Sequence, residues 1–193
     1  AFDEACAILA GDALQSLAFE VLSKAQGNAP DAQTRLDMLT TLSKAAGPAG
    51  MVGGQAIDLA AVGRNLDQSA LELMHRHKTG ALIEASVLLG AMASSQADAD
   101  SLKALQSYAA AIGLAFQVQD DILDVESDTA TLGKRQGADI AREKPTYPAL
   151  LGLDAAKAYA QELCEQALSA LHLFGSSAAP LRELARYIVQ RRS

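Results

Sequence analysis

The residues best suited to chemistry lie between positions 117 and 124, where the sequence reads Gln-Val-Gln-Asp-Asp-Ile-Leu-Asp. On a helix, Gln117, then Asp120 or Asp121, and then Asp124 are spaced i, i+3 or i+4, and i+7, so they share one face. The flanking positions are apolar, and carboxylates clustered among apolar side chains repel one another and lose hydration unless cations compensate them. Carboxylate oxygens suit Mg²⁺, which is often shared between acidic side chains and the phosphates of a substrate.

This acidic stretch also has a simpler interpretation. A solvated helix end rich in Asp gives the same pattern, and the motif alone does not decide between the two. An EF-hand is excluded, because Ile122 and Val125 stand at the third and sixth positions counted from Asp120. Those positions require an oxygen ligand and a glycine.

The residues after the acidic stretch supply positive charge. We expect a polar loop over residues 126–145, in which Lys134, Arg135, Asp139 and Lys144 follow the same helix end. A diphosphate held between Mg²⁺ and lysines would be well neutralised, and negative charge developing on a leaving diphosphate would be stabilised. Taken singly, Lys134, Arg135 and Lys144 are each better interpreted as ordinary surface charges.

A third candidate element surrounds Lys78, which stands just before a strongly apolar helical run. Its ammonium would be partly buried there and would need an anionic partner. Gly80 inside a helix indicates a kink or a close approach by another part of the chain. His75 and His77 are spaced i, i+2 and do not share a helix face, which disfavours a zinc site.

A fourth element is the segment of residues 53–59, Gly-Gly-Gln-Ala-Ile-Asp-Leu. Gln55 and Asp58 are spaced i, i+3, so both side chains can point inward. The alternative is a tight helix-packing site with a surface Asp.

These candidates are positioned by helices. No strand-like alternation of useful length is present, and Ala and Leu dominate a sequence that is half hydrophobic and only 4% aromatic, a balance that favours helix. Asp67 or Ser69, and Asp98 or Asp100, are expected N-caps. The two runs at 83–93 and 109–125 are apolar nearly all round and should be central. The expected helices cover residues 2–22, 32–51 with a kink at Gly47-Pro48, 53–62, 71–94, 98 or 100 to 125, 148–174 and 180–191.

Composition limits the function classes further. The length of 193 residues suits one domain, and the net charge of −7 argues against a nucleic-acid binder. No run of 18 purely apolar residues occurs, so no membrane span is expected. Cys6 and Cys164 form no metal-ligand pattern and are interpreted as two buried thiols of a reduced, cytoplasmic protein.

Taken together, the ordered motifs resemble the trans-isoprenyl (polyprenyl) diphosphate synthases, and most closely the bacterial farnesyl diphosphate synthases. The similarity covers nearly the whole chain, so that residues 1–193 resemble one polyprenyl synthase domain. The matching stretches are residues 8–14, 53–58, 75–83, 117–124, 129–139 and 144–153.

The resemblance implies an all-α isoprenoid-synthase bundle, a homodimer and a Mg²⁺-dependent head-to-tail condensation. An allylic diphosphate ionises, its carbocation alkylates the double bond of isopentenyl diphosphate, and a proton is lost. Lys78, Thr79 and Gln117 take catalytic roles, in which the Thr79 oxygens and Gln117 face the cation. The implied diphosphate-binding residues are Lys78, Lys134, Lys144 and Gln55. The implied metal ligands are Asp120, Asp121 and Asp124, with Asp139 and Asp58 as weaker candidates, and Asp120 and Asp124 are expected to reach the metal.

The sequence departs from the family pattern in one respect. The family carries a first aspartate-rich motif and paired arginines upstream of the segment that begins here, and DDxxD occurs once in these 193 residues. We therefore expect the C-terminal two-thirds or so of the fold, with N-terminal helices missing and little activity in this chain by itself. The alternatives are a non-catalytic partner subunit or regulator of the same fold, a terpene cyclase, and a helical interaction module.

Overall fold

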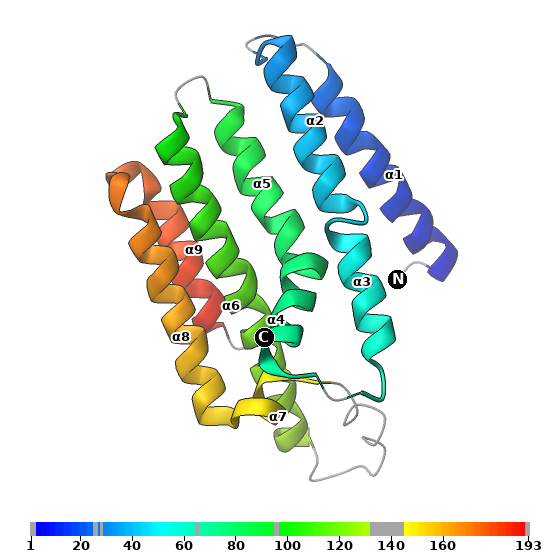
Figure 1. Cartoon of the computed structure of the whole chain (residues 1–193), viewed down its shortest axis with the longest axis vertical. Helices are drawn as coiled ribbons and strands as arrows, with labels where there is room; N and C mark the ends of the chain where they lie inside the picture. The colour runs from blue at the N-terminus through cyan, green and yellow to red at the C-terminus, as the bar shows by residue number, and fades with distance from the viewer. Residues whose placement is uncertain are drawn as a thin grey trace.

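The chain folds as a bundle of helices whose axes are roughly aligned (Figure 1). The computed structural model describes residues 3–24, 27, 29–64, 66–94, 97–131 and 145–191, and for 128–131 the backbone only. No strand occurs within these ranges, in agreement with the expected all-α fold. The elements are α1 (Glu4–Ser23), α2 (Ala32–Ala46), α3 (Met51–Ala61), α4 (Gln68–His75), the π-helical turn η1 (Arg76–Gly80), α5 (Ala81–Met92), α6 (Ala99–Thr131), α7 (Tyr147–Leu151), α8 (Leu153–Ala170), the 3₁₀ turns η3 (Leu171–Leu173) and η4 (Ser176–Ala178), and α9 (Ala179–Gln190).

Aspartates start several of these helices. Asp3, Asp31 and Asp67 are the N-caps of α1, α2 and α4, and each carboxylate accepts a hydrogen bond from a backbone N–H three residues later. Asp98 does the same for the Ser101 N–H at the start of α6. Such caps satisfy backbone donors that the first helical turn leaves without a partner. Of the expected caps, Asp67 and Asp98 are therefore confirmed, whereas Ser69 and Asp100 lie inside their helices.

Several expected boundaries were wrong. The helix expected over 32–51 ends at Ala46, and α3 starts after the break at residues 47–50. The helix expected over 71–94 starts earlier, at Gln68, and is interrupted by the π turn η1. Helix α6 continues to Thr131, so the loop expected over 126–145 is wrong for residues 126–131. Gly152, with φ +84°, divides the helix expected over 148–174 into α7 and α8.

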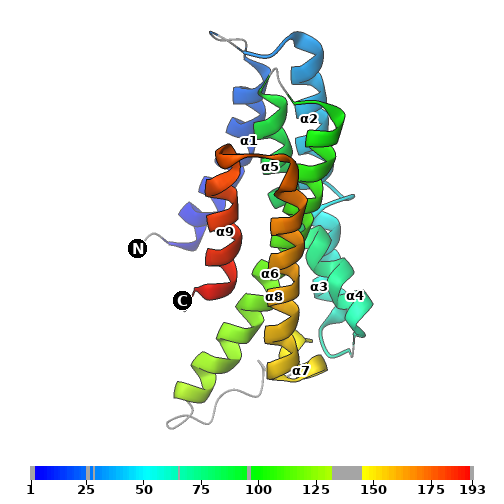
Figure 2. The same cartoon turned by 90° about the vertical axis from the view of Figure 1, so that its left-hand side faces the viewer.

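Helix α6 is the centre of the bundle. Its buried side chains run from Tyr108 to Ile122, and α8 packs along one side of it while α5 packs along another (Figure 1). Helix α9 lies against both α6 and α8 (Figure 2). The prediction that residues 109–125 are central is confirmed. Residues 83–93 also lie between α2 and α6, but only Ala85 of α5 is fully buried, so the same prediction is confirmed for their position and not for their burial.

Helix α1 contrasts with α6, because it has no buried residue. It packs against α2 and exposes large apolar side chains such as Ile8, Leu9 and Leu14. By length and composition it is the one described helix that could cross a membrane, which is weak evidence because core helices and signal sequences pass the same test. Cys6 on α1 is exposed and Cys164 is buried, so the prediction of two buried thiols is wrong for Cys6.

Candidate functional site

Polar side chains from three elements, α3, η1 and α6, form a row across the bundle. At one end, the Lys78 ammonium of η1 meets the Asp58 carboxylate of α3, with Nζ 2.5 Å from Oδ2. Next to Lys78, the Thr79 hydroxyl donates to Gln117 Oε1 of α6 at 2.5 Å. The Gln117 amide donates to Asp120 Oδ2 at 3.1 Å. We call Asp58, Lys78, Thr79, Gln117 and Asp120 the reactive row.

Lys78 has the anionic partner that its position before an apolar helix requires. The Asp58 side chain is 12% exposed and the Lys78 side chain 29% exposed. A partly desolvated ion pair attracts more strongly than a fully hydrated one, but each charge still reaches solvent. The ammonium is therefore held in place and remains accessible to an anionic ligand.

The π turn that carries Lys78 and Thr79 is shaped by two close backbone approaches. A Cβ on Gly54 of α3 would lie 2.1 Å from the Lys78 backbone nitrogen, so only glycine fits there. A Cβ on Gly113 of α6 would lie 3.2 Å from Gly80 Cα. The close approach predicted at Gly80 is thus confirmed and is made by α6, while α3 approaches the same turn at Lys78. A π turn inside an α-helix is rare and is often found at functional sites.

The three carboxylates of the acidic stretch point to different partners. Asp120 turns toward Gln117, whereas Asp121 Oδ2 accepts a hydrogen bond from the Tyr147 backbone N–H at 3.0 Å. Asp124 is exposed. The spacing left open whether Asp120 or Asp121 joins Gln117, and the hydrogen bonds select Asp120. Asp124 faces solvent, as in the solvated helix end that the sequence left open.

Arg191, at the C-terminal end of α9, was missed by sequence reasoning. Its guanidinium donates to Asp120 Oδ1 and lies 4.6 Å from the centroid of the Phe116 ring. The Arg191 carbonyl also accepts a hydrogen bond from Gln119 at 3.2 Å. The sequence offered one signal, a basic pair that follows a strongly amphipathic helix, but no local pattern links it to residue 120.

Of the remaining predicted site residues, the structure describes Gln55 alone. Gln55 is half-buried one helical turn before Asp58 on α3. Lys134, Asp139 and Lys144 lie outside the described residues, so their predicted contacts with diphosphate and metal are expectations only.

The acidic side chains fit a magnesium ion bound partly by substrate. Within the described residues, no group of three or more His, Cys, Asp or Glu side chains is arranged to hold a metal ion by itself. Asp120 and Asp124 are spaced i, i+4 on α6, and both reach solvent. Mg²⁺ commonly takes one or two carboxylates and completes its shell with water and substrate phosphates. This pair of carboxylates matches that mode of binding.

Comparisons with known proteins agree with this geometry. The sequence pattern of the polyprenyl synthetase family matches residues 1–172. The farnesyl diphosphate synthase of Escherichia coli (strain K12) is 53% identical over 193 residues, which cover 98% of this chain and 64% of that protein. The chain thus spans just under two-thirds of the length of this curated relative.

Solved structures show the same likeness. An FPP/GFPP synthase from Zymomonas mobilis superposes with a TM-score of 0.81 at 43% identity, covering 97% of this chain and 62% of that one. A geranyltransferase from Helicobacter pylori, complexed with magnesium and isoprenyl diphosphate, gives a TM-score of 0.74 at 36% identity, with coverages of 97% and 60%. The chain belongs to the polyprenyl synthetase family.

Proposed function

We propose that the protein is a prenyltransferase that condenses an allylic diphosphate, dimethylallyl or geranyl diphosphate, with isopentenyl diphosphate to give farnesyl diphosphate. The reactive row is the observation that carries this proposal. It brings three separate sequence motifs, at residues 53–58, 75–83 and 117–124, into one chain of contacts. The family membership and the names of the relatives in the comparisons support the same reaction.

In this mechanism Lys78 binds the diphosphate of the allylic substrate. The Asp58 contact fixes the direction of the ammonium before substrate arrives. As the carbon–oxygen bond of the allylic substrate breaks, negative charge grows on the leaving diphosphate, and a positioned ammonium stabilises it. Such preorganisation reduces the reorganisation that the site must undergo during bond cleavage.

The neighbouring dipoles act on the other product of ionisation. The oxygens of Thr79 and Gln117 are held together by their hydrogen bond at the junction of η1 and α6. We propose that these oxygens face the allylic carbocation and stabilise it, because fixed dipoles interact strongly with charge in a site that excludes water. The carbocation then alkylates the double bond of isopentenyl diphosphate, and a proton is lost.

We propose that Asp120 and Asp124 hold Mg²⁺, with Asp121 predicted beside them from the sequence and Asp139 and Asp58 as weaker candidates. The ion would neutralise the diphosphate as it leaves. Lys134, Lys144 and Gln55 are proposed to add contacts to the diphosphate. A homodimer in the cytoplasm is proposed from the family.

A second candidate is a non-catalytic partner subunit or regulator with the same fold. Under either function, this chain alone is expected to bind Mg²⁺-diphosphate and to show little turnover.

The product assay separates the two functions. The full-length gene product and the 193-residue chain are each incubated with geranyl diphosphate, isopentenyl diphosphate and Mg²⁺, and the products are identified by mass. Farnesyl diphosphate from the full-length protein, at a rate that falls sharply in Lys78→Ala, supports the prenyltransferase. Binding of Mg²⁺-diphosphate by the full-length protein without any product would contradict it and favour the regulator.

A further inference from the structure

The side chain of Asp121 points away from α6 in a different direction from that of its neighbour Asp120. Its Oδ2 accepts the Tyr147 backbone N–H at 3.0 Å, where α7 begins. The Thr146 hydroxyl caps the same helix by accepting the Ala149 N–H at 3.3 Å. A backbone donor at the start of a helix has no partner within the helix, so Asp121 supplies one from outside. The first turn of α7 is therefore fixed to α6 by this carboxylate.

The side chain of Tyr147 anchors the same point in the interior. It has no exposed surface. Its ring stacks on His75 of α4 with centroids 5.7 Å apart and leans on Tyr159 of α8 at 5.8 Å. Offset aromatic pairs at such distances stabilise the fold beyond their buried area. The ring therefore joins α7 to α4 and α8. Asp121 joins α7 to α6 at the same residue.

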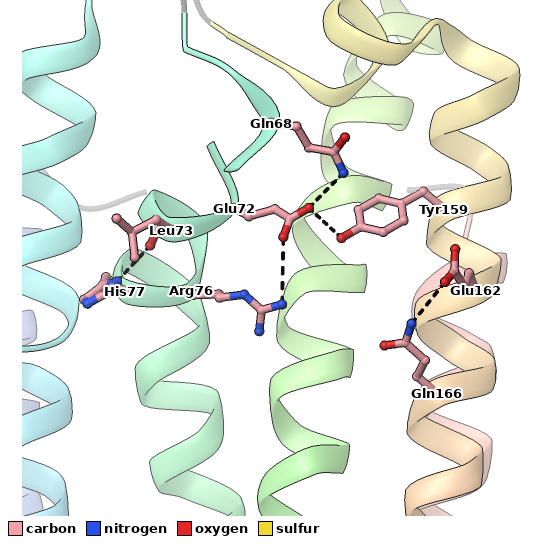
Figure 3. A network of polar contacts seen from close by, with 8 residues as sticks. All are labelled: Gln68, Glu72, Leu73, Arg76, His77, Tyr159, Glu162 and Gln166. Carbon is pink, nitrogen blue, oxygen red and sulfur yellow. Dashed lines mark hydrogen bonds and ion pairs between the residues drawn. The ribbon is translucent and has the colours of Figure 1, made fainter. Parts of the chain in front are cut away.

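Glu72 completes this arrangement (Figure 3). Its Oε1 accepts hydrogen bonds from the Tyr159 hydroxyl at 2.7 Å and from Gln68 at 2.9 Å. Its Oε2 lies 3.9 Å from the Arg76 guanidinium, at the first residue of η1. We call Asp121, Tyr147, His75, Tyr159 and Glu72 the clasp. It ends at η1, two residues before Lys78.

The neighbouring carboxylates of Asp120 and Asp121 thus belong to two different sets of contacts. Asp120 joins the reactive row directly through Gln117. Asp121 joins the clasp, whose contacts run through α7, α8 and α4 and reach η1 at Arg76. Successive residues on a helix point about 100° apart, so one carboxylate can face a ligand while the next faces the protein interior.

We propose that Asp121 is a positioning residue, which holds α7 through the Tyr147 N–H and so fixes the orientation of Asp120 and of η1, and that it gives no direct ligand to the metal. This inference rests on the proposed function and refines it, since the sequence predicted Asp121 as a ligand. A ligand and a positioning residue respond differently to loss of charge. The amide of Asn still accepts a hydrogen bond from a backbone N–H but carries no negative charge.

The test compares Asp121→Asn with Asp120→Asn in the full-length gene product. Inorganic diphosphate is titrated by calorimetry in the presence of Mg²⁺. We expect Asp120→Asn to weaken binding by about 50-fold or more, because an anionic ligand is lost. Asp121→Asn should weaken it by less than about fivefold, the effect of removing a screened charge nearby. Equal losses in the two variants would overturn the inference and leave the proposed function intact.

A second measurement uses Asp121→Ala, which removes the acceptor as well as the charge. We expect it to lower the melting temperature, and we expect Asp121→Asn to recover most of that loss. Recovery of stability by Asn, together with retained Mg²⁺-diphosphate binding, is the signature of a positioning residue. Recovery of stability without binding would overturn the inference. If the wild-type protein itself did not bind Mg²⁺-diphosphate, the proposed function would fail, and the inference with it.

Discussion

The reactive row and the clasp begin at adjacent residues of α6 and differ in almost every other property. The row holds charged and polar side chains that still reach solvent, and its contacts join α3, η1 and α6. The clasp is largely buried and aromatic, and its contacts join α6, α7, α8 and α4. A carboxylate is useful to a ligand when its charge remains accessible, and useful to the fold when its oxygens complete a buried network. Asp120 and Asp121 are adjacent on α6, so their side chains point in different directions and each serves one of these two uses.

The largest effect is expected in the reactive row. Lys78→Ala in the full-length protein should lower kcat/KM for the proposed condensation by about 10³-fold, because the leaving diphosphate loses a positioned cation. Stability should fall by only about 1 kcal/mol, since the pair with Asp58 is partly solvated. Steady-state kinetics and urea unfolding measure the two effects. The exposed Lys44→Ala serves as the control, and an equal loss of rate in that variant would contradict the assignment.

The clasp should respond in the opposite way. Tyr147→Ala removes a fully buried ring from between His75 and Tyr159 and should lower the free energy of unfolding by about 3–4 kcal/mol. Urea denaturation at neutral pH measures it. Within the described residues the Tyr147 hydroxyl has no hydrogen-bond partner. Tyr147→Phe should therefore be neutral or slightly stabilising. A large loss of stability in Tyr147→Phe would show that the hydroxyl, not the ring, carries the contact.

The junction between the two regions is tested at a glycine. Gly54→Ala forces a Cβ against the Lys78 backbone nitrogen and should destabilise the protein by about 2–3 kcal/mol. Gly90→Ala is the matched control, because nothing lies within 4 Å of the added Cβ in α5. That substitution should be neutral or stabilise by about 0.5–1 kcal/mol through better helix propensity. Similar melting temperatures for the two variants would contradict the close approach of α3 to η1.

The smallest effect concerns alkaline pH, which acts on the clasp. Burial, with the nearby Glu72, raises the pKa of Tyr147 above its usual range, and burial raises the pKa of Tyr159 as well. Above pH 10 the unfolded chain loses phenol protons that the folded protein keeps, so stability falls as pH rises. By pH 11 each of these tyrosines should account for about 1 kcal/mol of that loss.

Urea unfolding at pH 8 and pH 11 measures this dependence. Tyr147→Phe should flatten it, because the variant has no phenol to ionise at that position. The exposed Tyr187→Phe, at a residue 62% exposed, should leave it unchanged. Equal slopes for wild type and Tyr147→Phe would show that the buried phenol does not resist ionisation.

The sequence predicted much of the helical frame. Asp67 was identified as a cap because its side chain can accept a backbone N–H three residues on, a local property. The central position of residues 109–125 followed from their apolar composition, and the grouping of Gln117 with a carboxylate followed from helical spacing. Local chemistry and periodicity are sufficient for such features.

Other features depended on contacts between distant parts of the chain. Helical spacing could not choose between Asp120 and Asp121, because the choice depends on Gln117 and on Tyr147, 26 residues further along the chain. Arg191 is 71 residues from Asp120, and no local pattern links the two. The composition of α5 suggested a buried helix, but its burial depends on how many neighbours surround it. The π turn at residues 76–80 needed the approach of Gly54, which periodicity does not encode.

The most direct test of this division is a crystal structure of the full-length gene product with Mg²⁺ and inorganic diphosphate. We expect Asp120 and Asp124 to bind the metal, Lys78 Nζ to lie about 3 Å from a diphosphate oxygen, and Asp121 still to accept the Tyr147 N–H. Metal bound by Asp121, or a diphosphate remote from Lys78, would contradict it.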